Sequence, residues 1–81
     1  MNEEMRDKNE VAFNNKMKQA CMLSKQPELN DYEKMMIGVY LGMCKMLASL
    51  EVAYTGDDFL LDRYKILMPD ICKHAGLPQP L

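Results

Sequence analysis

The sequence has little of the material from which disulfide-rich domains and metal centres are built. Its 81 residues include three cysteines and one histidine. Cys21, Cys44 and Cys72 are odd in number and widely spaced, with no CxxC pair. Small secreted domains usually carry an even set of cysteines, and a structural zinc site needs four suitable ligands. We therefore expect free thiols in the cytoplasm, no metal site and no cofactor.

Basic runs, a targeting segment and a long apolar run are also missing. Twelve acidic residues outnumber ten basic ones, for a net charge of −2, so there is no basic block to bind a phosphate backbone. The acidic beginning, MNEEMRDKNE, is unlike a secretory signal peptide. The longest apolar stretch, residues 35–50, contains Lys45 and is shorter than the roughly 20 residues that span a bilayer. These absences argue against nucleic-acid binding and membrane insertion.

No group of side chains has the pattern of a catalytic site. Cys72 and the single histidine, His74, are two residues apart, so on a helix they would point away from each other. The acidic residues gather where helices are expected to begin, which capping and the helix dipole explain. The sequence has no phosphate-binding loop, dinucleotide fingerprint or zinc-finger spacing. We therefore expect no catalytic residues and no enzymatic activity.

Apolar residues repeat at helical spacing in three segments, and no segment alternates as a strand would. This pattern predicts an all-α fold, a small three-helix domain. The second helix has the clearest start, because Asn30 and Glu33 have the spacing of a capping box. Within a single domain of residues 1–81, the expected helices cover about residues 10–24, 30–54 and 57–76.

The ends of these segments carry further signals. Gly56 and Gly76 suit the left-handed position that closes a helix, so the second and third helices are expected to stop there. Pro69 lies inside the third segment, and we expect this helix to be kinked or broken at that residue. Residues 1–8 are polar and are expected either to extend the first helix or to fray, and residues 77–81 are expected to form an extended, proline-rich tail.

The central segment, MMIGVYLGMCKMLASL, is apolar around most of its circumference when it is drawn as a helix. A surface helix usually buries one apolar stripe, and two neighbouring helices can cover only part of this one. The remaining apolar side would be exposed, and such patches usually mark an interface. We therefore expect an oligomeric helical bundle, with a homodimer favoured. The alternative is a compact monomer in which the first and third helices wrap the second. The residues expected to carry self-association are Gly38, Gly42, Met43, Met46 and Leu47.

Two glycines interrupt this apolar helix, and each costs about 1 kcal/mol relative to alanine. They share one narrow stripe with two polar residues: Gly38, Gly42, Lys45 and Ser49. A closely packed second helix, a ligand against bare backbone, or simple exposure to water would each explain them. In the ligand interpretation, an anionic molecule such as a nucleotide would be bound by Lys34, Lys45, Arg63 and Lys65.

Nine methionines also occur, and this flexible side chain fills irregular cores and adaptable binding surfaces. Met36 and Tyr40 are expected to bind a protein partner, with Tyr40 as an aromatic anchor. The sequence thus favours a non-enzymatic protein–protein interaction module, an inhibitor, adaptor or regulator of the size that phages and mobile elements encode. The alternative is an oligomeric binder of a small anionic ligand.

Overall fold

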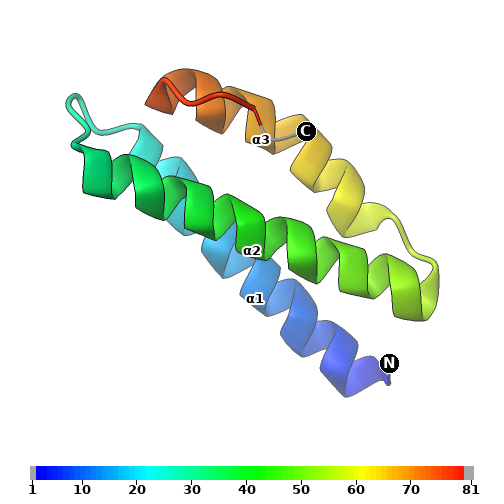
Figure 1. The fold of residues 1–81 in the computed structure, drawn as a ribbon. Coiled ribbons are helices and arrows are strands. Elements are labelled where there is room, and N and C mark those ends of the chain that lie inside the picture. Colours follow the sequence, from blue (N-terminus) through cyan, green and yellow to red (C-terminus); the bar gives the residue numbers. More distant parts are fainter. Residues whose placement is uncertain (1, 80–81) are drawn as a thin grey trace.

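The computed structural model describes residues 2–79 and arranges them as three helices (Figure 1). Helix α1 spans Glu3–Ser24, α2 spans Asp31–Thr55 and α3 spans Phe59–Ala75. No strand occurs within residues 2–79. The structure thereby confirms the all-α, three-helix domain expected from the periodicity, and the domain is elongated, with extents of 41 × 21 × 15 Å.

Helix α2 is the centre of the fold. Both α1 and α3 pack along it, and they contact each other over a smaller area (Figure 1). Short turns at residues 25–30 and 56–58 reverse the chain, so that consecutive helices run in opposite directions. The buried core draws on all three helices and consists of Phe13, Met17, Ala20, Ile37, Leu41, Cys44, Ala48, Leu60, Tyr64, Met68, Ile71, Cys72 and Ala75.

The predicted helix signals at both ends of α2 are confirmed. Asn30 Oδ1 accepts the backbone N–H of Glu33 at 2.8 Å, and the Asn30 backbone N–H donates to Glu33 Oε1 at 3.1 Å, which completes the capping box. Gly56 closes α2 with a φ of 72°, and Gly76 closes α3 with a φ of 68°. Both glycines adopt the left-handed conformation that other residues rarely accept.

Of the two alternatives for the polar N-terminal residues, extension of the first helix is confirmed for residues 3–8, because α1 begins at Glu3 and not near residue 10. Asn2 caps the helix, its Oδ1 accepting a backbone N–H of the first turn at 2.8 Å. Tertiary contacts then anchor the polar turns: Arg6 pairs with carboxylates near the end of α2, and Asn9 Nδ2 donates to the Leu47 carbonyl at 3.0 Å. Local polarity alone suggested fraying, and these contacts prevent it.

Of the two alternatives expected at Pro69, the break is wrong, because α3 continues through this residue to Ala75, and the kink stays a prediction. Proline costs the helix one backbone hydrogen bond. The residues around it, Met68, Ile71 and Cys72, are nevertheless buried in the core, so tertiary packing holds both halves in one helix.

The tail begins where the Leu77 N–H donates to the Cys72 carbonyl at 2.9 Å, just after Gly76. Residues 77–79 are non-helical, and residues 80–81 of the expected tail lie outside the described residues. Leu77 packs against the core, so the tail lies against the bundle at this point.

Candidate functional site

Helix α2 carries two lengthwise seams whose members alternate four and three residues apart. Positions with this spacing lie on one face of a helix. The inner seam is buried against α1 and α3 and consists of Ile37, Leu41, Cys44, Ala48 and Glu51. The second, which we call the outer seam, lies roughly 150° away around the helix and consists of Tyr32, Met36, Val39, Met43, Met46, Leu50 and Ala53.

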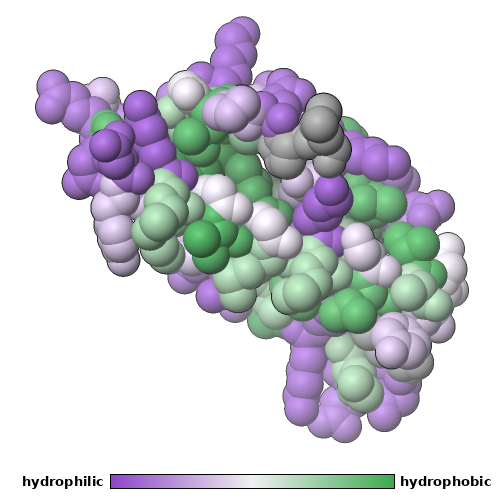
Figure 2. All heavy atoms as spheres, in the orientation of Figure 1, coloured by the Kyte–Doolittle hydropathy of each residue, from purple (hydrophilic) through white to green (hydrophobic). Residues whose placement is uncertain are grey.

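The outer seam is uncovered in the single chain. Met36 and Met43 are half-buried, and the other members are exposed. Among its exposed large side chains the exposed fraction runs from 38% at Leu50 to 65% at Tyr32. The flanking Met35 and Tyr54 are exposed as well. Figure 2 shows this face of α2 as a band of apolar surface bordered by hydrophilic side chains.

The size of this face is close to that of a specific interface. The large exposed side chains of the outer seam and its flanks would bury on the order of 600 Å² per chain, and a standard interface buries about 800 Å² per partner. Monomeric proteins rarely expose contiguous apolar patches larger than a few hundred Å². Between residues 35 and 50 the only charged side chain on α2 is Lys45, which lies off the outer seam. The outer seam is therefore a candidate interface.

Helix α2 is also long and apolar enough, by length and composition alone, to cross a membrane. Its most apolar window has a mean hydropathy of 1.4, and 28% of that window is buried inside the fold. The mostly buried core helices of soluble proteins and signal sequences pass the same test. The inner seam is already buried against α1 and α3. The outer seam is therefore the apolar part of α2 that only another molecule could cover.

The five residues predicted to carry self-association do not share one surface. Met43 and Met46 lie on the outer seam. Leu47 is half-buried and packs against the core. Gly38 and Gly42 lie roughly 100° around α2 from the outer seam, on the side that faces α3 and the tail.

The two predicted partner-binding residues are also separated. Met36 belongs to the outer seam. Tyr40 is half-buried and packs against the core, and the Lys16 ammonium lies 5.7 Å from the centre of its ring. This is the geometry of a cation–π contact, so Tyr40 helps to join α1 to α2.

Gly38 and Gly42 line a groove of about 320 Å³ between α2, α3 and the tail, which we call the glycine groove. Lys34 and Lys45 line it too, so the structure brings both glycines together with two of the four predicted anion-binding cations. A Cβ added at either glycine would meet no atom of the described residues within 4 Å. Close packing within this chain therefore does not explain the glycines.

The other two predicted cations lie elsewhere. Arg63 Nη1 donates to Asn14 Oδ1 at 3.2 Å, between α3 and α1. Lys65 is exposed on α3 and lines none of the grooves described here. The predicted set of four cations is thus divided among three places.

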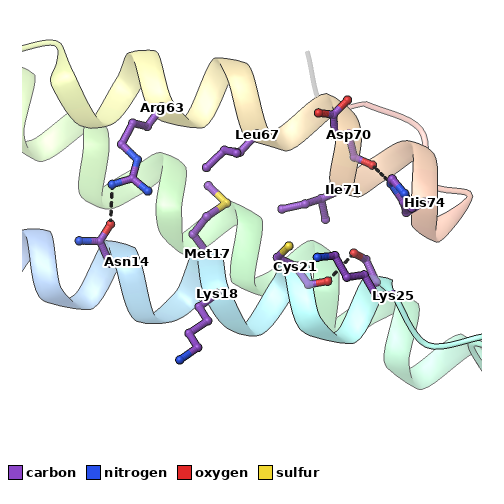
Figure 3. A pocket seen from close by; sticks show the side chains of 11 residues that line it. Asn14, Met17, Lys18, Cys21, Lys25, Arg63, Leu67, Asp70, Ile71 and His74 are labelled. Atoms are coloured by element: carbon purple, nitrogen blue, oxygen red, sulfur yellow. Dashed lines mark hydrogen bonds between the residues drawn. The ribbon is translucent and has the colours of Figure 1, made fainter.

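A second groove of about 420 Å³, the α1–α3 groove, lies between those two helices (Figure 3). Its floor is formed by Met17, Cys21, Leu67 and Ile71. Around them lie Asn14, Lys18, Ser24, Lys25, Arg63, Asp70 and His74. Sequence reasoning missed this groove. The sequence feature that could have revealed it is the four-residue spacing of its apolar residues, Met17 and Cys21 on one helix and Leu67 and Ile71 on the other.

A cluster of charges joins α1 to the end of α2 and the turn after it. Arg6 Nε lies 3.5 Å from Glu51 Oε1 and 3.6 Å from Glu10 Oε1, and Arg6 Nη2 also donates to Asp57 Oδ2. The Glu51 side chain is 0% exposed, whereas the Arg6 side chain is 37% exposed. Within residues 2–79 neither Glu51 oxygen accepts a hydrogen bond. One guanidinium thus faces three carboxylates.

The environment of Glu51 favours its protonated form. Burial raises the pKa of the Glu51 carboxyl, the Glu10 and Asp57 carboxylates raise it further, and Arg6 opposes them by lowering it. Sequence reasoning did not single out Glu51. The available signal was its position, which continues the spacing of the buried inner seam.

The three thiols differ in burial, and Cys21 lines the α1–α3 groove together with His74. Cys44 and Cys72 are buried, and burial raises the pKa of Cys44 to about 11 and that of Cys72 above its usual value, so both are protonated at neutral pH. Cys21 is half-buried, and His74 is exposed with Nδ1 2.8 Å from the Asp70 carbonyl oxygen. Among residues 2–79 no three potential metal ligands come together.

Comparison with known protein families, with curated proteins and with solved structures gave no match. Function must therefore be inferred from the outer seam, the two grooves and the charge cluster. Of these features, the outer seam is the one that follows most directly from the composition of α2.

Proposed function

We propose that this chain is a non-enzymatic helical interaction module that forms a homodimer by pairing the outer seams of two α2 helices. The observation that carries the proposal is the outer seam itself, seven apolar residues at uninterrupted heptad spacing on an uncovered face. Helices with this repeat pair by inserting side chains of one seam between those of the other. A seam that pairs with itself gives a closed two-fold assembly.

Such a dimer leaves the face between α1 and α3 open, because that face lies on the side of the inner seam. The module can then bind a protein partner there, in the role of an inhibitor, adaptor or regulator. Three free cysteines, two of them buried, suit a reducing compartment such as the cytoplasm.

The mass of the chain across a concentration series tests this proposal. We expect sedimentation equilibrium to show the mass rising from the 9.4 kDa of the monomer toward twice that value. The expected Kd is on the order of micromolar, because the face is slightly smaller than a standard interface. A chain that remains monomeric at about 500 µM, far above this Kd, contradicts the proposal.

A second candidate function, the binding of a small anionic molecule, is favoured by the glycine groove. Lys34 and Lys45 line it together with the bare backbone of Gly38 and Gly42. The phosphates of a nucleotide would lie between the two lysine side chains, against backbone that no Cβ covers.

Thermal unfolding with and without ATP tests this second function. Saturating ATP is expected to raise Tm by several degrees, because a ligand that binds only the folded chain stabilises it. Lys34→Ala should reduce this shift. Lys8→Ala should not, because Lys8 is 76% exposed and pairs with Glu4 on α1. No shift with ATP, or equal shifts in all three proteins, contradicts anion binding in the groove.

A further inference from the structure

The α1–α3 groove has an apolar floor. Met17 and Ile71 are each only 4% exposed, and Cys21 and Leu67 are half-buried. Figure 3 shows Leu67 and Ile71 extending from α3 toward Met17 and Cys21 on α1. The floor is therefore apolar on both helices, and Cys21 and Leu67 are its accessible residues.

The charged residues that line the groove are mostly basic, although the chain as a whole is acidic. The chain carries −2 as a whole. Lys18 on α1, Lys25 just after it and Arg63 on α3 line the groove, and Asp70 is the one carboxylate among its lining residues. All four side chains belong to exposed residues. The local excess of positive charge therefore favours an occupant that carries carboxylates.

The shape of the groove favours a helix as the occupant. It is a trough open along one side, and it extends from Asn14 on α1 to Lys25 at the end of that helix, roughly 16 Å or three helical turns. Small molecules usually bury 70–90% of their surface in a binding site, which an open trough does not provide. A helix needs to bury only one stripe, and a helix laid between two others gives the packing of a four-helix bundle.

We propose that the α1–α3 groove binds an acidic amphipathic helix of a partner protein. Apolar side chains at i, i+3, i+4 and i+7 of that helix lie on the floor. Its carboxylates pair with Lys18, Lys25 and Arg63, and Arg63 exchanges the Asn14 amide for a charged acceptor. This inference names the partner chemistry of the interaction module proposed above. It does not require the dimer, because the groove and the outer seam are on opposite faces.

Two synthetic peptides serve as probes. The first is an amphipathic helix of about 18 residues, long enough to be helical, with leucines at the spacing above and glutamates beside them. The second replaces every glutamate with lysine. Three exposed ion pairs predict that the acidic peptide binds about tenfold more tightly than the basic one. The acidic peptide should also slow alkylation of Cys21 by a maleimide, because Cys44 and Cys72 are buried and Cys21 lines the groove.

Charge reversal in the groove provides the matched variants. Lys18→Glu combined with Arg63→Glu should remove or reverse the preference for the acidic peptide. Lys8→Glu combined with Lys65→Glu makes the same change in net charge outside the groove and should keep that preference. Both double variants should keep the sedimentation mass of the wild type, so failure of the dimer and failure of the groove remain distinguishable.

Several results would overturn the proposal. They are binding of neither peptide, equal binding of both, an unchanged preference in the groove variant, and binding that leaves Cys21 alkylation unchanged. Protection of Cys21 by dodecanoate without protection by the acidic peptide would also overturn it, because the occupant would then be a small amphiphile.

Discussion

Glutamate at both Val39 and Met46 is expected to weaken self-association at least a hundredfold while leaving the three helices folded. Both residues lie on the outer seam one heptad apart, and they are 46% and 57% exposed in the single chain. The fold of the monomer therefore tolerates a polar side chain at either position. In the dimer the same positions lie in the middle of the interface, in both parallel and antiparallel pairing of the two α2 helices.

The size of the effect follows from what the interface would have to bury. Each chain contributes two carboxylates to an apolar surface that supplies no basic partner, so four negative charges meet near the centre of the dimer. Like charges placed together in an interface cost several kcal/mol, and each 1.4 kcal/mol changes Kd tenfold. A hundredfold loss is thus the smallest effect consistent with pairing through the outer seam.

A control with the same chemistry is Val11→Glu combined with Ile66→Glu. These side chains are 58% and 69% exposed on α1 and α3, away from the outer seam. The control makes the same change in net charge and should keep the sedimentation mass of the wild type, and circular dichroism should show equal helix content in all three proteins. Equal masses for the two double variants would refute the role of the outer seam. So would a wild-type chain that is monomeric in buffer and binds phosphatidylcholine vesicles, which would identify lipid as the cover of this face.

The ends of the helices could be predicted because their causes are local. The capping box of Asn30 and Glu33 needs only residues three apart, and Gly56 and Gly76 need only their own backbone angles. At the start of α1 and at Pro69 the sequence left two alternatives open, extension or fraying and a kink or a break, because the choice depends on contacts between helices.

The candidate interface could be predicted only in part, for a similar reason. Helix α2 is apolar on more sides than two neighbouring helices can cover. The sequence alone therefore predicts that one apolar side of α2 is exposed. Which residues occupy that side depends on where α1 and α3 lie. Leu47 packs against the core, and Gly38 and Gly42 face the tail and α3. Of the predicted set, only Met43 and Met46 therefore lie on the outer seam.

Arg6→Met is expected to lower the free energy of unfolding at pH 7 by about 3 kcal/mol, the low end of the cost of removing one partner from a buried ion pair. The low end applies because the Arg6 side chain is 37% exposed and partly screened by water, whereas Glu51 is fully buried. The loss is a large share of the 5–15 kcal/mol by which domains are usually stable. Urea unfolding followed by circular dichroism at one protein concentration measures it.

Lys8→Met is the matched control. Lys8 also pairs with a carboxylate, that of Glu4, on the same helix, but the two side chains are 76% and 77% exposed. Exposed ion pairs contribute about 0–1 kcal/mol, so this change should have little effect. Equal losses from Arg6→Met and Lys8→Met would show that the Glu51 carboxylate does not depend on Arg6.

Glu51→Gln is expected to act in the opposite direction, and the pH dependence shows why. The folded pKa of Glu51 lies above its unfolded value, so the folded chain holds this proton more tightly than the unfolded chain does. The resulting stability is fully present below the unfolded pKa, about 4.3, and is lost as the pH rises through the folded pKa. Glutamine is neutral at every pH, so the variant should be more stable than the wild type at pH 7, and the difference should disappear near pH 4.

The double variant Arg6→Met with Glu51→Gln separates the buried pair from the rest of the cluster. If the penalty of Arg6→Met comes from the uncompensated Glu51 carboxylate, the second change should recover most of the lost stability at pH 7. The remainder should reflect Glu10 and Asp57, which are partly exposed and can be solvated. Additive effects of the two changes would instead place the penalty in lost packing of the Arg6 side chain along α1. A penalty that persists unchanged at pH 4, where the folded chain holds the Glu51 proton, would also place the penalty in lost packing.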